Sequence, residues 1–70
     1  MFNKEQYRAS KPAVKRFYEK NGFSEMPVFS ALAFVPILVV YEFLMEDYPE
    51  IEEQCKERIK GIKDFFGYKD

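Results

Sequence analysis

The middle of the chain is apolar on every side. Residues Met26 to Tyr41 carry no charged side chain, and the apolar run continues past Glu42 to Met45. At about 1.5 Å per residue, a helix over Pro27 to Met45 would reach roughly 30 Å, the thickness of the hydrocarbon core of a bilayer. A helix without a polar face has no side suited to water. The pattern therefore predicts one transmembrane helix within residues 24–46.

A short basic helix is predicted before this stretch, within residues 1–23. Ser10 is a suitable N-cap, and Gly22 suits the left-handed position that ends many helices, so we expect a helix over Lys11 to Lys20. Its apolar side chains fall on one side at helical spacing, and basic side chains occupy much of the rest. This arrangement suits an anionic lipid surface. The residues predicted to contact the membrane surface are Lys11, Lys15, Arg16 and Lys20.

The third segment, residues 47–70, has the pattern of an amphipathic helix. Acidic residues gather at its start and basic residues follow, which matches the helix dipole. An apolar stripe runs along it at steps of three and four residues, and Gly67 is placed to end the helix. The preferred cover for this stripe is another subunit, and the alternatives are the lipid surface or the chain's own first helix. The stripe residues expected to bind a partner are Ile51, Cys55, Ile59, Ile62 and Phe66.

The predicted fold class is therefore all-α, with a single transmembrane helix flanked by a short basic N-terminal helix and a C-terminal amphipathic helix. The three expected units are residues 1–23, 24–46 and 47–70. A chain of 70 residues buries little apolar surface by itself, so we expect lipid or a partner to supply the rest. Basic side chains are more numerous on the N-terminal flank of the span, which predicts an N-terminus on the cytoplasmic or matrix side.

Three residues within the predicted span are candidates for contact with a larger membrane protein. Ser30 is the only polar side chain of the run before Glu42. Pro36 lacks an N–H and would kink the helix, either as an ordinary membrane proline or as a hinge. Glu42 is the one ionisable residue in the run, and it either reaches headgroup water or pairs with a Lys or Arg of a partner.

Side chains suited to catalysis or metal binding are scarce. The chain has no histidine, which excludes the usual acid–base relays and the common haem and zinc sites. Cys55 is the only cysteine and is expected to be a small packing residue. The glycines form no phosphate-binding loop, and a formal net charge of -1 argues against nucleic-acid binding. We therefore expect a protein that is not an enzyme and that has no cofactor, metal or small-molecule substrate.

Two short motifs resemble the 7a-type small subunit of cytochrome c oxidase. The matrix-side segment of that family is similar to Lys15-Arg16-Phe17-Tyr18-Glu19-Lys20-Asn21-Gly22 followed by Met26-Pro27-Val28, and the end of its span is similar to Tyr41-Glu42 with Pro49. The stretch between the motifs is shorter here, and the tail after Pro49 is additional. The resemblance implies a non-catalytic accessory subunit that supports the assembly or stability of an electron-transport complex in the mitochondrial inner membrane.

Two other classes of protein fit the same pattern. One is a small bacterial or phage membrane regulator that binds a larger membrane protein. The other is a soluble helical interaction domain, in which the central stretch would be a buried helix. The membrane interpretation requires that this stretch is not enclosed in a self-sufficient globule with charged groups on its outer flank.

Overall fold

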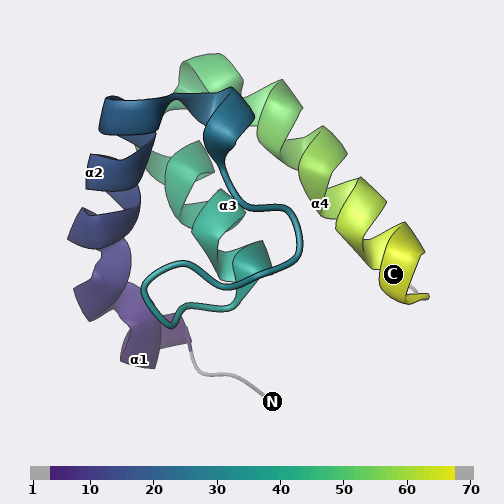
Figure 1. The fold of residues 1–70 in the computed structure, drawn as a ribbon, viewed down its shortest axis with the longest axis horizontal. Coiled ribbons are helices and arrows are strands. Elements are labelled where there is room, and N and C mark those ends of the chain that lie inside the picture. The colour runs from purple at the N-terminus through teal and green to yellow at the C-terminus, as the bar shows by residue number, and fades with distance from the viewer. Residues whose placement is uncertain (1–3, 68–70) are drawn as a thin grey trace.

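Residues 4–67 are described by a computed structural model, and they form helices joined by short turns and one longer loop (Figure 1). Residues 4–67 contain no β-strand, so the all-α class predicted from the sequence is confirmed for this part of the chain. In chain order, the elements are α1 (Lys4–Tyr7), η1 (Arg8–Ser10), α2 (Lys11–Asn21), η2 (Phe23–Glu25), α3 (Ile37–Asp47), η3 (Pro49–Ile51) and α4 (Glu52–Phe66), where η marks a 3₁₀ helix.

The long helix predicted within residues 24–46 is wrong in its first half. Residues 26–36 form a loop, and α3 begins only at Ile37. Pro36 explains the break, because it has no N–H to donate and because the residue before a proline avoids helical angles. The Pro36 carbonyl instead starts α3 by accepting hydrogen bonds from Val39 and Val40 at 2.9 and 3.1 Å. Among the helices of residues 4–67, none is long and apolar enough to cross a bilayer.

The two flanking helices lie close to their predicted bounds. α2 covers the helix predicted over Lys11 to Lys20 and ends where Gly22 adopts a φ of 86°. The Gly22 N–H donates to the Tyr18 carbonyl at 2.8 Å and closes the last turn. Ser10 stands at the N-cap position but makes no side-chain capping hydrogen bond. α4 ends at Gly67, whose φ of 74° is the left-handed conformation expected of a helix-ending glycine.

α3 is the central helix of the core, and it lies between α2 and α4 (Figure 1). Since two helices and the loop all contribute to its cover, α3 can be apolar around most of its circumference without a membrane. Its polar flank consists of Glu42 in the middle of the helix and of Glu46 and Asp47 at its C-terminal end. The buried residues are Val39, Val40, Tyr41, Phe43 and Leu44 of α3, Val14 of α2, Ile51 of η3, Cys55 and Ile62 of α4, and Met26 and Val35 of the loop.

The loop contains a strained turn. The Val35 N–H donates to the Leu32 carbonyl at 3.0 Å, and the residues between them, Ala33 and Phe34, have positive φ angles of 56° and 64°. Two successive positive φ angles are typical of a type I′ turn, which prefers Asn-Gly. Residues with a β-carbon are strained there by about 1–2 kcal/mol each. Phe34 is 95% exposed, so packing within the chain does not offset this cost.

Replacing Ala33 and Phe34 together by Asn and Gly should stabilise the fold. The expected gain in the free energy of unfolding is about 1–2 kcal/mol, because relief of strain exceeds the extra freedom of glycine in the unfolded chain. Urea unfolding measures the change. The matched control carries Asn and Gly at Ser30 and Ala31, which have no positive φ, and it should gain nothing. If the two double variants changed the free energy of unfolding equally, the turn at Ala33 and Phe34 would not be strained.

Candidate functional site

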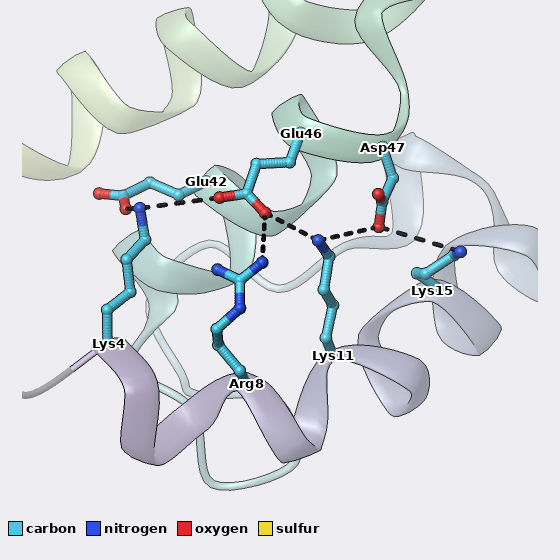
Figure 2. A network of polar contacts seen from close by, with 7 residues as sticks. All are labelled: Lys4, Arg8, Lys11, Lys15, Glu42, Glu46 and Asp47. Atoms are coloured by element: carbon cyan, nitrogen blue, oxygen red, sulfur yellow. Dashed lines mark hydrogen bonds and ion pairs between the residues drawn. The ribbon is translucent and has the colours of Figure 1, made fainter.

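A network of ion pairs joins the N-terminal helices to the polar flank of α3 (Figure 2). At its centre, Glu46 Oε1 accepts hydrogen bonds from Lys11 Nζ at 2.7 Å and from Arg8 Nη2 at 3.3 Å. The side chains of the network are partly exposed, so each pair contributes about 0–1 kcal/mol to stability. Four basic residues of α1, η1 and α2 face three acidic residues of α3. The basic residues are Lys4, Arg8, Lys11 and Lys15, and the acidic residues are Glu42, Glu46 and Asp47.

Two of the residues predicted to contact a membrane surface belong to this network. Lys11 and Lys15 pair with carboxylates of α3, whereas Arg16 and Lys20 are exposed. The sequence left two surroundings possible for Glu42, headgroup water or a basic residue of a partner. In the structure it pairs with Lys4 of α1. These ion pairs therefore help to hold α1 and α2 against α3.

The network changes the proton affinity of its central residues. The hydrogen bond from Lys11 lowers the pKa of Glu46 below its ordinary value of 4.5, and Arg8 adds to this effect. The hydrogen bond to Glu46 is the largest of the interactions that raise the pKa of Lys11 above 10.5. Because folded Glu46 binds a proton less tightly than unfolded Glu46, its contribution to stability is present above pH 4.5 and is lost as the pH falls through its lowered pKa.

Glu46→Gln is expected to make the fold less sensitive to acid. Glutamine does not ionise, so part of the stability that the wild-type chain loses on acidification is already absent from the variant. Urea midpoints at neutral pH and at a pH below 4.5 measure the effect. Glu25→Gln is the control, because it changes an exposed residue outside the network. On acidification, this variant should lose as much stability as the wild type does. Equal losses in all three proteins would contradict this role of Glu46.

Most of the apolar stripe, which begins at Ile51 of η3 and continues along α4, is covered by the chain itself. Ile51, Cys55 and Ile62 are buried, and Ile59 is partly buried against the core. α3 packs against α4 and supplies much of this cover, so the stripe is not left open for another subunit as the sequence suggested. Phe66 is the exception, because it is 50% exposed at the end of the helix.

The other residues selected from the sequence lie apart from one another. Cys55 is 0% exposed, and burial raises the pKa of its thiol to about 11, which agrees with a packing residue that stays protonated. Ser30 is exposed in the loop, and Pro36 stands at the start of α3. No group of side chains suited to holding a metal ion occurs within residues 4–67.

Three phenylalanine rings form an exposed cluster, which we name the aromatic patch (Phe29, Phe65 and Phe66). Phe29 comes from the loop, and the other two rings come from the C-terminal end of α4. The ring centre of Phe29 lies 4.5 Å from that of Phe65 and 6.2 Å from that of Phe66. The three side chains are 55%, 67% and 50% exposed in chain order. The loop and α4 therefore display a contiguous apolar surface to solvent.

A groove runs beside the aromatic patch, and we name it the α4 groove. It lies between the loop and α4 and has a volume of about 380 Å³. Its walls are mostly apolar and include Val28, Ile62 and two rings of the aromatic patch, Phe29 and Phe65. Glu57 adds a carboxylate to the lining. The patch and the groove together form the candidate binding surface of the molecule.

Arg58 fixes the wall of the α4 groove from the inside. Its Nη1 donates to the Met26 carbonyl at 3.2 Å and to the Tyr41 hydroxyl at 2.7 Å. Its guanidinium lies 4.7 Å from the centre of the Phe23 ring. The Tyr41 hydroxyl in turn donates to the Pro27 carbonyl. Arg58 and Tyr41 therefore each hold one carbonyl of the loop, those of Met26 and Pro27, against the core.

Sequence reasoning missed two of the three rings of the aromatic patch. Phe29 falls inside the run that was assigned to the membrane, and Phe65 falls beside the apolar stripe of α4 rather than on it. The one available signal was the Phe65-Phe66 pair, because a helix with a single apolar stripe turns one of two neighbouring positions away from that stripe. An apolar residue just off the stripe near the end of a helix therefore indicated an exposed ring.

Comparison with protein-family models, with curated proteins and with solved structures finds no match to this chain. The resemblance to the 7a-type small subunit of cytochrome c oxidase therefore stays a prediction.

Proposed function

We propose that this chain is a non-catalytic helical interaction domain, an accessory protein that binds a larger protein through the aromatic patch. The observation that carries the proposal is the mutual packing of Phe29, Phe65 and Phe66 at the surface, each at least half exposed. Aromatic side chains are enriched where proteins bind each other, since each ring supplies a large apolar contact at a small cost in conformational entropy. Burying the exposed half of one ring yields about 1 kcal/mol.

The proposal retains the accessory role that the sequence suggested and leaves out the spanning helix. A transmembrane form of Pro27 to Met45 would require the loop to become helical and α3 to leave the core. Tyr41 would then lose its contact with Arg58, and the buried apolar residues of α2 and α4 that pack against α3 would be exposed. An interaction domain needs none of these changes. Membership of a respiratory complex in the mitochondrial inner membrane is a narrower proposal, which the identity of the bound partner would test.

The test is capture of the partner from the native source by chemical crosslinking and mass spectrometry, with wild-type and variant chains in parallel. Phe65→Ala should remove the specifically captured protein, because it deletes the most exposed ring of the aromatic patch. Phe34→Ala is the matched control, since Phe34 is 95% exposed and has no part in the patch. Thermal unfolding verifies that both variants are folded. Retention of the same partner by Phe65→Ala would overturn the proposal.

A further inference from the structure

We infer that the α4 groove binds a segment of the partner protein in which a long aliphatic or aromatic side chain lies beside a lysine or arginine. This inference rests on the proposed function and names the chemistry of the partner. Three features of the groove carry it: its apolar walls, an unexplained glycine and an exposed carboxylate that takes no part in the ion pairs within residues 4–67.

The apolar walls of the groove indicate that the partner inserts a large apolar side chain. Val28, Phe29, Ile62 and Phe65 surround a volume of about 380 Å³, which is enough for one or two large apolar side chains. The groove also continues into the aromatic patch, because Phe29 and Phe65 belong to both. An apolar side chain in the groove would therefore bring the neighbouring partner surface onto the exposed rings.

Gly61 indicates how closely the partner approaches. It lies in the middle of α4 with helical geometry, where glycine is less favourable than alanine. The fold does not require it, since a β-carbon at this position would have no neighbour within 4 Å. Gly61 does line the α4 groove. A partner segment that packs against the bare backbone of the helix would explain a glycine that the isolated chain does not use.

Glu57 determines the charge of the partner. The charged side chains that line the groove are Glu57 and Arg58. Arg58 is already engaged with the Met26 carbonyl, the Tyr41 hydroxyl and a ring. Glu57 is exposed, and none of the ion pairs formed within residues 4–67 includes it. Of these two charged side chains, the exposed one is therefore the Glu57 carboxylate, and a basic residue of the partner can pair with it.

Two synthetic peptides test the chemistry, one an amphipathic helix of leucine and lysine and the other its leucine and glutamate counterpart. Each is titrated into the ¹⁵N-labelled full chain, and amide shifts are followed by NMR. The lysine peptide should shift the amides of Gly61 and its groove neighbours, and the glutamate peptide should bind at least about tenfold more weakly. Glu57→Lys should reverse this order. Equal binding of both peptides, or shifts confined to another face, would overturn the inference.

Gly61→Met tests the position of the occupant. Methionine fills the groove and favours a helix more than glycine does, so the variant should keep a thermal midpoint at or above that of the wild type. Its affinity for the lysine peptide should fall at least about tenfold. Lys60→Met places the same side chain on the neighbouring exposed residue outside the groove lining, and it should bind as the wild type does. Unchanged binding by Gly61→Met would overturn the inference.

The capture experiment separates this inference from the proposed function. If Phe65→Ala loses the partner while Gly61→Met and Glu57→Lys retain it, the groove inference fails and the interaction domain stands. If Phe65→Ala retains the partner, both fail. Two further experiments test other occupants of the groove. Sedimentation equilibrium tests for a second copy of the chain, and flotation with vesicles of phosphatidylcholine and phosphatidylglycerol tests for a lipid surface. Self-association or vesicle binding that Gly61→Met abolishes would overturn the inference in favour of a second copy or a lipid surface.

Discussion

Phe43→Ala is expected to lower the free energy of unfolding by about 3–5 kcal/mol, because it opens a cavity at the centre of the core. Phe43 is 0% exposed on α3, the helix against which both α2 and α4 pack. A domain of this size has a total stability of about 4–10 kcal/mol, so the variant loses a large part of it. Urea unfolding followed by far-ultraviolet circular dichroism measures the loss.

The matched control for Phe43→Ala is Phe34→Ala, which removes the same atoms from a ring that is 95% exposed. Its effect on the free energy of unfolding should stay within about 0.5 kcal/mol. The account of α3 as a core helix would be contradicted if the two substitutions had similar effects. That result would mean that the side of α3 carrying Phe43 is not enclosed.

Arg58→Ala is expected to cost about 2–3 kcal/mol of stability, because hydrogen bonds of a charged donor and a cation–π contact are lost together. Arg58 donates to the Tyr41 hydroxyl at 2.7 Å and to the Met26 carbonyl at 3.2 Å, and its guanidinium lies 4.7 Å from the Phe23 ring. Thermal and urea unfolding measure the cost. Arg16→Ala removes an exposed arginine of α2 and should be nearly neutral.

A double-mutant cycle then locates the interaction. Tyr41→Phe removes the hydroxyl that accepts the hydrogen bond from Arg58 and keeps the buried ring. If the two side chains act together, the double variant should lose less stability than the two single losses added, by about 0.5–3 kcal/mol. Additive losses would contradict the direct contact between them.

The flanking helices could be predicted from the sequence because their signals are local. Gly22 and Gly67 end α2 and α4 with positive φ angles, as their positions in the sequence indicated. The stripe of α4 was also identified, and Ile51, Cys55 and Ile62 of that stripe are buried. What covers the stripe depends on residues that are distant in the sequence, and periodicity carries no information about them.

The central stretch was misread because apolar character alone does not distinguish lipid from protein as the surrounding medium. Pro36 was taken as a kink in a continuous helix, whereas it marks the boundary between the loop and α3. The polar flank that a buried helix needs is present in Glu42, Glu46 and Asp47, but these residues fall at the end of the run. Their role became visible only when the lysines and the arginine of the N-terminal helices were placed opposite them (Figure 2).

The candidate binding surface could be predicted only in part. Phe66 was identified as a partner-binding residue, and its exposure is consistent with that prediction. Phe29 and Phe65 join it because the loop folds back along α4, a contact between residues far apart in the sequence. Gly61 shows the same limit, since its open surroundings follow from the packing of α4 and not from its helical neighbours.

The most direct test of the enclosed central helix is a nuclear Overhauser spectrum of the labelled chain in buffer without detergent. The account predicts ring-to-ring cross-peaks between Phe23 and Tyr41, whose centres lie 6.0 Å apart, and between Tyr18 and Tyr48, at 4.5 Å. It also predicts that, between residues 26 and 47, helical cross-peaks begin only after Pro36. Unbroken helical cross-peaks from Pro27 to Met45, without the ring contacts, would contradict it.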